Sequence, residues 1–205
     1  MSTLYIWTNS MSIIENIKDI LENRSPVPLE NSDQHYIHAA VLIPLFRVPG
    51  GYRVLFTQRT NRVEHHKGQI SFPGGVVEEM DNSLEETALR ESYEEIGLLD
   101  KDVEILGQMD DTYTVASNFI VHPFVGRIPY PYDFKISPKE VNRIITVPLD
   151  LFFKIDAYQK IDLSGIDDPT YVGPVYPYQD AIIWGATARI MENFVEVLGG
   201  KLDLP

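Results

Sequence analysis

Three absences narrow the chemistry open to this chain. Its 205 residues include no cysteine, which excludes disulfides, thiolate metal sites and cysteine nucleophiles. No apolar run approaches the roughly 20 residues that a membrane-spanning helix needs. Basic residues are scarce, with 17 Lys and Arg against 30 Asp and Glu. The net charge of −13 therefore argues against nonspecific binding to DNA or RNA, which depends on basic side chains.

The N-terminus also lacks the basic-then-apolar order of a signal peptide. We therefore expect a cytoplasmic protein that binds neither nucleic acid nor membrane. No linker-like stretch divides the chain, so we expect one main domain over residues 35–205, preceded by a helical extension over residues 1–34. The sequence leaves both a monomer and a homodimer open.

The stretch from residue 68 to 97 organises the rest of the chain. It begins as an apolar run, breaks at Pro73-Gly74-Gly75 and continues as a predicted helix. Ser83, followed three residues later by Glu86, has the capping-box pattern, and Gly97 stands where a helix-ending glycine belongs. Apolar residues between them recur at steps of three and four, which predicts one buried face: Leu84, Ala88, Leu89, Tyr93 and Ile96.

Three carboxylates share one face of this predicted helix. Glu91, Glu94 and Glu95 lie at positions i, i+3 and i+4, so their side chains project together. Like charges at this spacing destabilise a helix by roughly 0.2–0.5 kcal/mol per pair. A hard divalent cation such as Mg²⁺ would make the clustering of these carboxylates favourable, because it prefers carboxylate oxygens as ligands. The alternative is a plain solvated face, since Glu-rich helix surfaces are common.

The residues around these carboxylates resemble the Nudix box. Residues 90–98, Arg-Glu-Ser-Tyr-Glu-Glu-Ile-Gly-Leu, follow its signature, with Gly75 and Asp81 at its start. The spacer before Arg90 is one residue longer than usual, and Ser92 stands where an aliphatic residue is common. The resemblance implies a Nudix hydrolase with an α/β fold, an α/β/α sandwich around a mixed sheet. It also implies Mg²⁺ or Mn²⁺ as cofactor and a small nucleotide as substrate.

The same resemblance implies roles for individual residues. The metal ligands would be three carboxylates and one backbone carbonyl, those of Glu91, Glu94, Glu95 and Gly75. Arg90 would orient one of the glutamates, and Arg90, Glu94 and Glu95 would form the catalytic set. The proton of the attacking water would pass to Glu94, to Glu95 or to a loop acid such as Glu140. The sequence is equally compatible with Glu140 being a simple surface acid.

A locally basic segment precedes the box. Residues 53–67 carry one acid, Glu64, against four basic side chains, which favours an anionic substrate over a solvated loop: Arg53, Arg59, Arg62 and Lys67. From Leu55 to Gly75 the chain resembles the extra motif of coenzyme A pyrophosphatases within the Nudix family. Glu64 stands where that motif has its second arginine.

The second resemblance implies a substrate and the residues that bind it. The substrate would be coenzyme A or a derivative, cleaved to adenosine 3′,5′-bisphosphate and 4′-phosphopantetheine, and the binding residues would be Arg59, Arg62, His66 and Lys67. Glu64 favours the alternative of ADP-ribose or another nucleoside diphosphate conjugate. A non-catalytic nucleotide-binding module is a third reading, which the intact carboxylates oppose.

The flanking segments predict the remaining elements. Residues 11–23 have the period of an amphipathic helix, and residues 110–114 read as a solvated turn whose acids are less favoured as metal ligands. Residues 151–179 read as irregular, and the last helix is expected from about residue 180 to 198. Strands are expected over residues 39–46, 53–59, 103–107 and 119–126.

Overall fold

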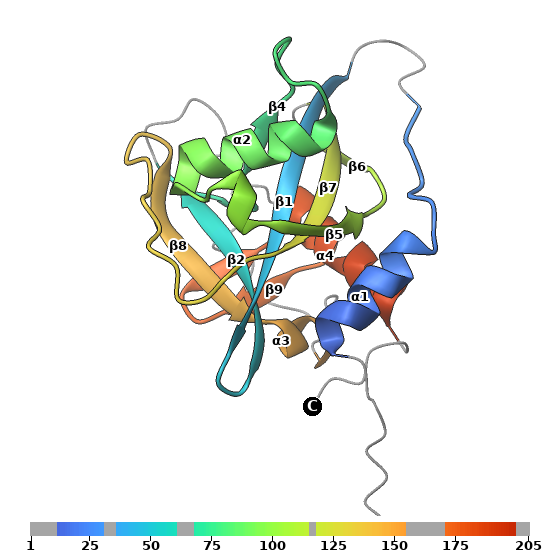
Figure 1. Cartoon of the computed structure of the whole chain (residues 1–205), viewed down its shortest axis with the longest axis vertical. Coiled ribbons are helices and arrows are strands. Elements are labelled where there is room, and N and C mark those ends of the chain that lie inside the picture. The colour runs from blue at the N-terminus through green and yellow to red at the C-terminus, as the bar shows by residue number, and fades with distance from the viewer. Residues whose placement is uncertain (1–11, 31–35, 61–67, 115–117, 155–170, 200–205) are drawn as a thin grey trace, which may run out of the picture.

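A mixed eight-stranded sheet forms the centre of the molecule (Figure 1). The computed structural model describes residues 12–30, 36–60, 68–114, 118–154 and 171–199. The strands of the sheet are β1 (Ile37–Val48), β2 (Gly51–Arg59), β3 (Ile70–Ser71), β4 (Gly74–Val76), β5 (Glu104–Gln108), β6 (Thr112–Thr114), β7 (Phe119–Arg127) and β8 (Val141–Pro148). The helices are α1 (Ile13–Glu22), α2 (Leu84–Ile96), α3 (Leu149–Lys154) and α4 (Gly185–Leu198), with a 3₁₀ turn over Asp100–Asp102.

The pairing of β1 makes the sheet mixed. This strand runs parallel to β7, from Ile37 opposite Phe119 to Leu45 opposite Arg127. Its pairing with β2 is antiparallel, and so is its pairing with β4. The spatial order is β3-β2-β1-β7-β5, with β8 added on β2 and β6 on β7. Strand β1 therefore lies at the centre, as expected for the most apolar strand of the chain.

Alternation along β1 sends side chains into two apolar layers. Ile43 and Leu45 pack with residues of α1, α3 and α4 on one face. Ala40 and Leu42 pack with α2 on the other face. Figure 1 shows α2 across one side of the sheet and α4 across the opposite side. The predicted α/β/α sandwich around a mixed sheet is confirmed.

The predicted solvated turn at residues 110–114 is wrong. Asp110 pairs with Arg24, and Asp111 accepts hydrogen bonds from the Leu29 amide at 3.0 Å and His122 Nδ1 at 2.7 Å. The side chain of Asp111 is 4% exposed, and residues 112–114 form β6. These acids hold the segment that follows α1 against the sheet. Their partners lie far away in the sequence, so a local pattern could not reveal them.

The C-terminal region also differs from the prediction. A two-stranded hairpin precedes the last helix: β9 (Tyr176–Tyr178) lies in the segment expected to be irregular, and β10 (Ala181–Ile183) takes the place of the expected start of the helix. Gln179 adopts a positive φ of 54° in its turn, and α4 begins only at Gly185. Helix α3 occupies the start of a segment expected to be irregular. In the part of the chain that the structure describes, no helix is both long and apolar enough to span a membrane.

Candidate active site

The helix that carries the acidic cluster begins and ends as its sequence predicts. Ser83 Oγ accepts a hydrogen bond from the Glu86 amide at 3.1 Å, so Ser83 is the N-cap. The carboxylate of Glu86 bonds to the amide of Asn82 instead of returning to Ser83, so only half of the capping box forms. At the other end Gly97 adopts the left-handed conformation, with φ of 68°, which ends α2.

The loop between β7 and β8, which packs in the same apolar layer as α2, satisfies the last carbonyl groups of this helix. The amide of Lys135 donates to the carbonyl oxygen of Ile96 at 2.9 Å, and that of Ser137 donates to the carbonyl oxygen of Glu95 at 2.8 Å. The same loop ends at Glu140, whose carbonyl oxygen accepts from the Thr60 amide just after β2. Residues distant in sequence thereby bring Glu140 to the acidic face of α2.

Arg90 ties the start of the box to its glutamates. Its guanidinium binds Asp81 through two hydrogen bonds, of 2.8 Å from Nε and 3.0 Å from Nη2. Nη1 donates to Glu91 Oε1 at 2.8 Å, and Nη2 also donates to the Val76 carbonyl oxygen at 3.0 Å. The hydrogen bonds from Arg90 hold the pKa of Asp81 well below its usual range. Arg90 thus fixes both the loop before α2 and the position of one carboxylate.

The carboxylate of Glu91 lies directly against the backbone of Gly75. A Cβ atom added at Gly75 would lie 2.4 Å from Glu91 Cδ and 2.5 Å from Oε1. Only glycine permits this approach, because real Cβ atoms do not come so close to other heavy atoms. Burial raises the pKa of Glu91, while the hydrogen bond from Arg90 opposes that rise.

Glu95 is the most buried carboxylate of the cluster. Its side chain is only 3% exposed, and its ion-pair partner Arg59 lies 3.8 Å away, from Nη1 to Oε1. Thr57 Oγ1 lies 3.5 Å from its other oxygen, too far for a strong hydrogen bond. The pKa of Glu95 is raised to about 8, chiefly by burial and in part by the charges of Glu91 and Glu140, while the charge of Arg59 opposes the rise. Among the described residues, no cation lies closer to this carboxylate than Arg59.

Glu94 completes the acidic face but points outward. Its side chain is 53% exposed and lies 3.4 Å from Arg90 Nη1. Within the described residues, no three acidic or histidine side chains are gathered as a ready metal cage. The donor chemistry still fits a hard divalent cation, because carboxylates dominate the face and no described residue pairs closely with the buried Glu95. Mg²⁺ commonly keeps several waters and shares its remaining ligands with phosphate, so it needs no complete protein cage.

Arg59 is the only predicted substrate-binding residue within the described part of the chain. It lies at the end of β2, and its side chain is 30% exposed. Arg62, His66 and Lys67 fall outside the described residues, as does Glu64. The structure therefore brings Arg59 to the acidic cluster and does not place the others.

A buried hydroxyl group beside Glu95, that of Thr57, and the half-buried Ser71 that contacts it were missed by the sequence reasoning. Thr57 is fully buried on β2, and its Oγ1 lies 3.2 Å from Ser71 Oγ on β3. The signal available for Thr57 was its polar side chain inside an otherwise apolar strand. Ser71 gave no such signal, because its proximity depends on the pairing of β2 with β3.

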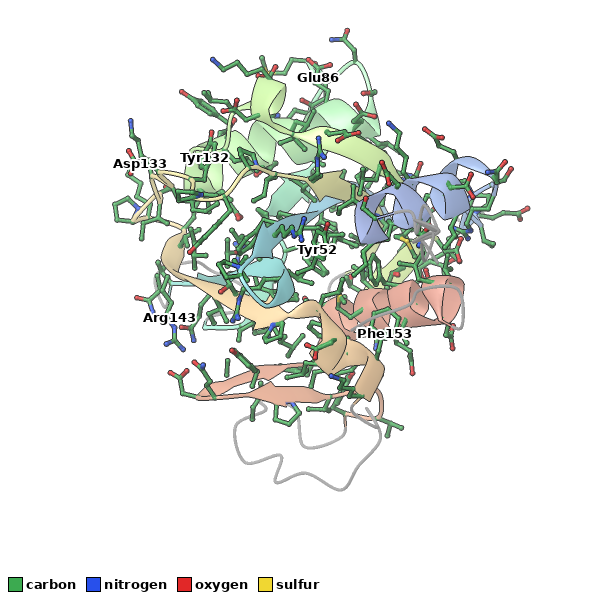
Figure 2. All side chains as sticks on the ribbon, turned by 60° about the horizontal axis from the view of Figure 1, so that its bottom comes forward. Tyr52, Glu86, Tyr132, Asp133, Arg143 and Phe153 are labelled. Atoms are coloured by element: carbon green, nitrogen blue, oxygen red, sulfur yellow. The ribbon has the colours of Figure 1, made fainter. Side chains whose placement is uncertain are left out.

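A polar network beside Arg59 joins the C-terminal hairpin to the sheet. Arg143, on β8, donates from Nε to Gln58 Oε1 at 2.8 Å and pairs through Nη2 with Asp180 Oδ2 at 2.7 Å. Gln58 in turn donates to the carbonyl oxygen of Gly68 at 3.2 Å. Figure 2 shows Arg143 near the β9–β10 hairpin. The described contacts of this network link β2, β8 and the hairpin and do not include Glu95.

A separate surface pocket of about 790 Å³ lies at the tip of the β1–β2 hairpin. Arg47, Tyr52 and Tyr130 line it. It lies at the opposite end of β1 from the pairing with Gly75, and none of the box carboxylates reaches it. Its size therefore does not make it the site of chemistry, since the charged cluster lies elsewhere.

Clustered helix carboxylates lie beside a glycine turn on a mixed sheet between helical layers, and their oxygen donors suit a hard divalent cation. Comparison with known proteins gives the family. The profile of the NUDIX domain matches residues 36–161. The chain belongs to the Nudix hydrolase family, whose members act on nucleoside diphosphate derivatives and generally use divalent metal ions.

Relatives among curated proteins carry the same family name. The uncharacterized Nudix hydrolase NudL of Photorhabdus laumondii is 35% identical over 173 residues, which cover 83% of this chain and 89% of the relative. NudL of Yersinia enterocolitica is 35% identical over 161 residues, covering 78% of this chain and 80% of the relative. The similarity thus extends well beyond the box itself.

Solved Nudix structures are also similar in fold. A C. elegans Ap4A hydrolase binary complex matches with a TM-score of 0.47 and 19% identity, covering 55% of this chain and 80% of that one. The NUDIX domain of Shewanella oneidensis NrtR, complexed with ADP ribose, matches with a TM-score of 0.47 and 20% identity, covering 64% of this chain and 82% of that one.

Proposed function

We propose that this protein hydrolyses the diphosphate linkage of coenzyme A or a derivative, releasing adenosine 3′,5′-bisphosphate and 4′-phosphopantetheine. The observation that carries the hydrolytic part is Glu95, a carboxylate 3% exposed whose only described ion-pair partner lies 3.8 Å away. A buried carboxylate with so weak a partner is costly unless a cation binds it. The coenzyme A motif from Leu55 to Gly75 supports the choice of substrate.

In this proposal Glu91, Glu94, Glu95 and the Gly75 carbonyl hold Mg²⁺ or Mn²⁺. The metal ion, when bound, supplies charge neutralisation for the diphosphate and lowers the pKa of a bound water. Arg90 keeps Glu91 in place through its 2.8 Å hydrogen bond, and Asp81 keeps Arg90 in place. The side chains of this network are mostly buried, which limits their rearrangement when a ligand enters.

The hydrolysis also needs a base for the attacking water. The water oxygen bonds to phosphorus, the bridging P–O bond breaks with its electron pair leaving on the departing phosphate, and the water's proton passes to a carboxylate. Besides Glu91, which is bonded to Arg90, the acids near this face are Glu94, Glu95 and Glu140, and these three are the candidate bases. Single Gln variants separate them, because loss of the base removes the ascending limb of the pH–rate profile, whereas loss of a ligand chiefly raises the metal requirement.

A panel of diphosphate substrates with Mg²⁺ tests the proposal through product identity. Coenzyme A, dephospho-coenzyme A, ADP-ribose and a dinucleotide are incubated separately, and the products are identified by mass. The expected products from coenzyme A are adenosine 3′,5′-bisphosphate and 4′-phosphopantetheine. Cleavage of ADP-ribose with no action on coenzyme A would establish the second candidate, which Glu64 in the coenzyme A motif favours.

A further inference from the structure

Arg59 is the one described cation facing Glu95, yet it fits that carboxylate poorly. The closest approach of the two side chains is 3.8 Å, from Nη1 to Oε1, which is an ion pair without a good hydrogen bond. Arg59 Nε is buried and has no hydrogen-bond partner among the described residues. A buried donor left unpaired is unfavourable, so this guanidinium is not in its best arrangement.

A divalent cation on Glu95 would change the position of Arg59. Two positive charges would then compete for one carboxylate, and the divalent ion would hold it more strongly. Arg59 is 30% exposed, so its guanidinium can turn towards solvent, whereas Glu95 at 3% exposure cannot. The released guanidinium would lie beside the metal with an unpaired donor, which suits a phosphate oxygen.

We propose that Arg59 is an exchangeable counter-ion, paired with Glu95 in the metal-free protein and transferred to the substrate diphosphate when the metal binds. This inference rests on the proposed function, since it assumes a metal on Glu95 and a diphosphate substrate. It adds that metal binding and nucleotide binding are coupled through the side chain of Arg59. Arg59 opposes the metal while no nucleotide is present and supports the nucleotide once the metal is bound.

The exchange predicts effects of opposite sign from a single substitution. Arg59→Gln should tighten Mg²⁺ binding to the nucleotide-free protein by about fivefold, because a unit charge at about 4 Å in water changes an ion's energy by about 1 kcal/mol. The same variant should weaken ADP binding at saturating Mg²⁺. An arginine that only binds substrate would leave Mg²⁺ affinity unchanged, and an arginine that only supports the fold would not tighten it.

The experiment consists of two titrations, followed by calorimetry or NMR. Mg²⁺ is titrated into the nucleotide-free protein, and ADP is titrated into the protein at a fixed, saturating concentration of free Mg²⁺. Both titrations are run at about pH 9, where protons compete little for carboxylates. Arg143→Gln is the matched control, because it removes one nearby positive charge that pairs with Asp180 and not with Glu95. Arg59→Lys should keep a Mg²⁺ affinity close to that of the wild type. Unchanged or weaker Mg²⁺ binding by Arg59→Gln overturns the exchange.

A second measurement needs no destabilising variant. In the wild-type protein, the NMR signal of Arg59 Nε, assigned by its absence from Arg59→Lys, should shift and exchange faster with solvent when Mg²⁺ is added alone. A signal indifferent to bound Mg²⁺ would overturn the exchange while leaving hydrolysis intact. If Mg²⁺ does not bind the protein at all, it is the proposed function that fails.

Discussion

The adjacent glycines Gly74 and Gly75 should fail in different ways when each is replaced by alanine. At Gly75 the new Cβ would meet only the end of the Glu91 side chain, with Cδ at 2.4 Å. That carboxylate is the end of a side chain and can give way, but it then loses its hydrogen bond to Arg90, so Gly75→Ala should lower the free energy of unfolding by about 1 kcal/mol. The displaced Glu91 would leave Arg90 and the proposed metal position. A misplacement of about 1 Å costs on the order of 100-fold in rate.

At Gly74 the new Cβ would meet backbone. It would lie 2.4 Å from the Ala40 carbonyl oxygen and 2.6 Å from Val41 Cα, and φ is +153°. Overpacking and strain together should cost about 3 kcal/mol. For a chain of this length, that lowers the melting temperature by about 6–12 °C.

Thermal melts, Mg²⁺ titrations and rates on both variants test this contrast. Gly75→Ala should melt close to the wild type, with weaker Mg²⁺ binding and about 100-fold slower hydrolysis. Gly74→Ala should show the large melting shift. Full activity of Gly75→Ala would refute the reasoning, because Glu91 would then not need its contact with Gly75.

Three further predictions concern substrate choice and stability. Glu64→Arg should raise kcat/KM for coenzyme A more than for dephospho-coenzyme A, since a carboxylate near the 3′-phosphate costs about 1 kcal/mol at 4 Å in water; an equal change for both would place Glu64 away from that phosphate. Asp81→Asn should lower the free energy of unfolding at neutral pH by roughly 1–3 kcal/mol through its weaker bonds to Arg90. Because folding lowers the pKa of Asp81 below its ordinary 3.8, the wild type loses this stability as pH falls below about 4, and denaturant melts of the two proteins should converge there. Asp111→Asn should cost roughly 1–3 kcal/mol at neutral pH while leaving Mg²⁺ affinity unchanged; a loss of Mg²⁺ binding would contradict its placement outside the site.

Local signals account for the parts of the fold that could be predicted. The N-cap Ser83 and the C-terminal Gly97 mark the ends of α2 within the sequence itself, and both are confirmed. The apolar run over residues 39–46 predicted a strand in the same way, and it is confirmed as part of β1. These features depend on residues a few positions apart.

Contacts between distant segments explain the misses. Asp111 is buried by Leu29 and His122, of which Leu29 lies 82 residues earlier, so its acid pair reads locally as a solvated turn. The spacing of Ile183 and Thr187 suits a helix, yet Ile183 is buried as the last residue of β10. The weak pairing of Arg59 with Glu95 also needed the folded sheet, because the two residues lie on different elements.

The rate of coenzyme A hydrolysis against Mg²⁺ concentration, measured for the wild type, Glu94→Gln and Glu95→Gln, tests the central claim most directly. Circular dichroism confirms that each variant is folded. The account predicts no hydrolysis by the wild type in excess chelator, recovery on adding Mg²⁺ or Mn²⁺, and a kcat lower by orders of magnitude in each variant. Full wild-type activity in chelator, or full activity of folded Glu95→Gln, would contradict it.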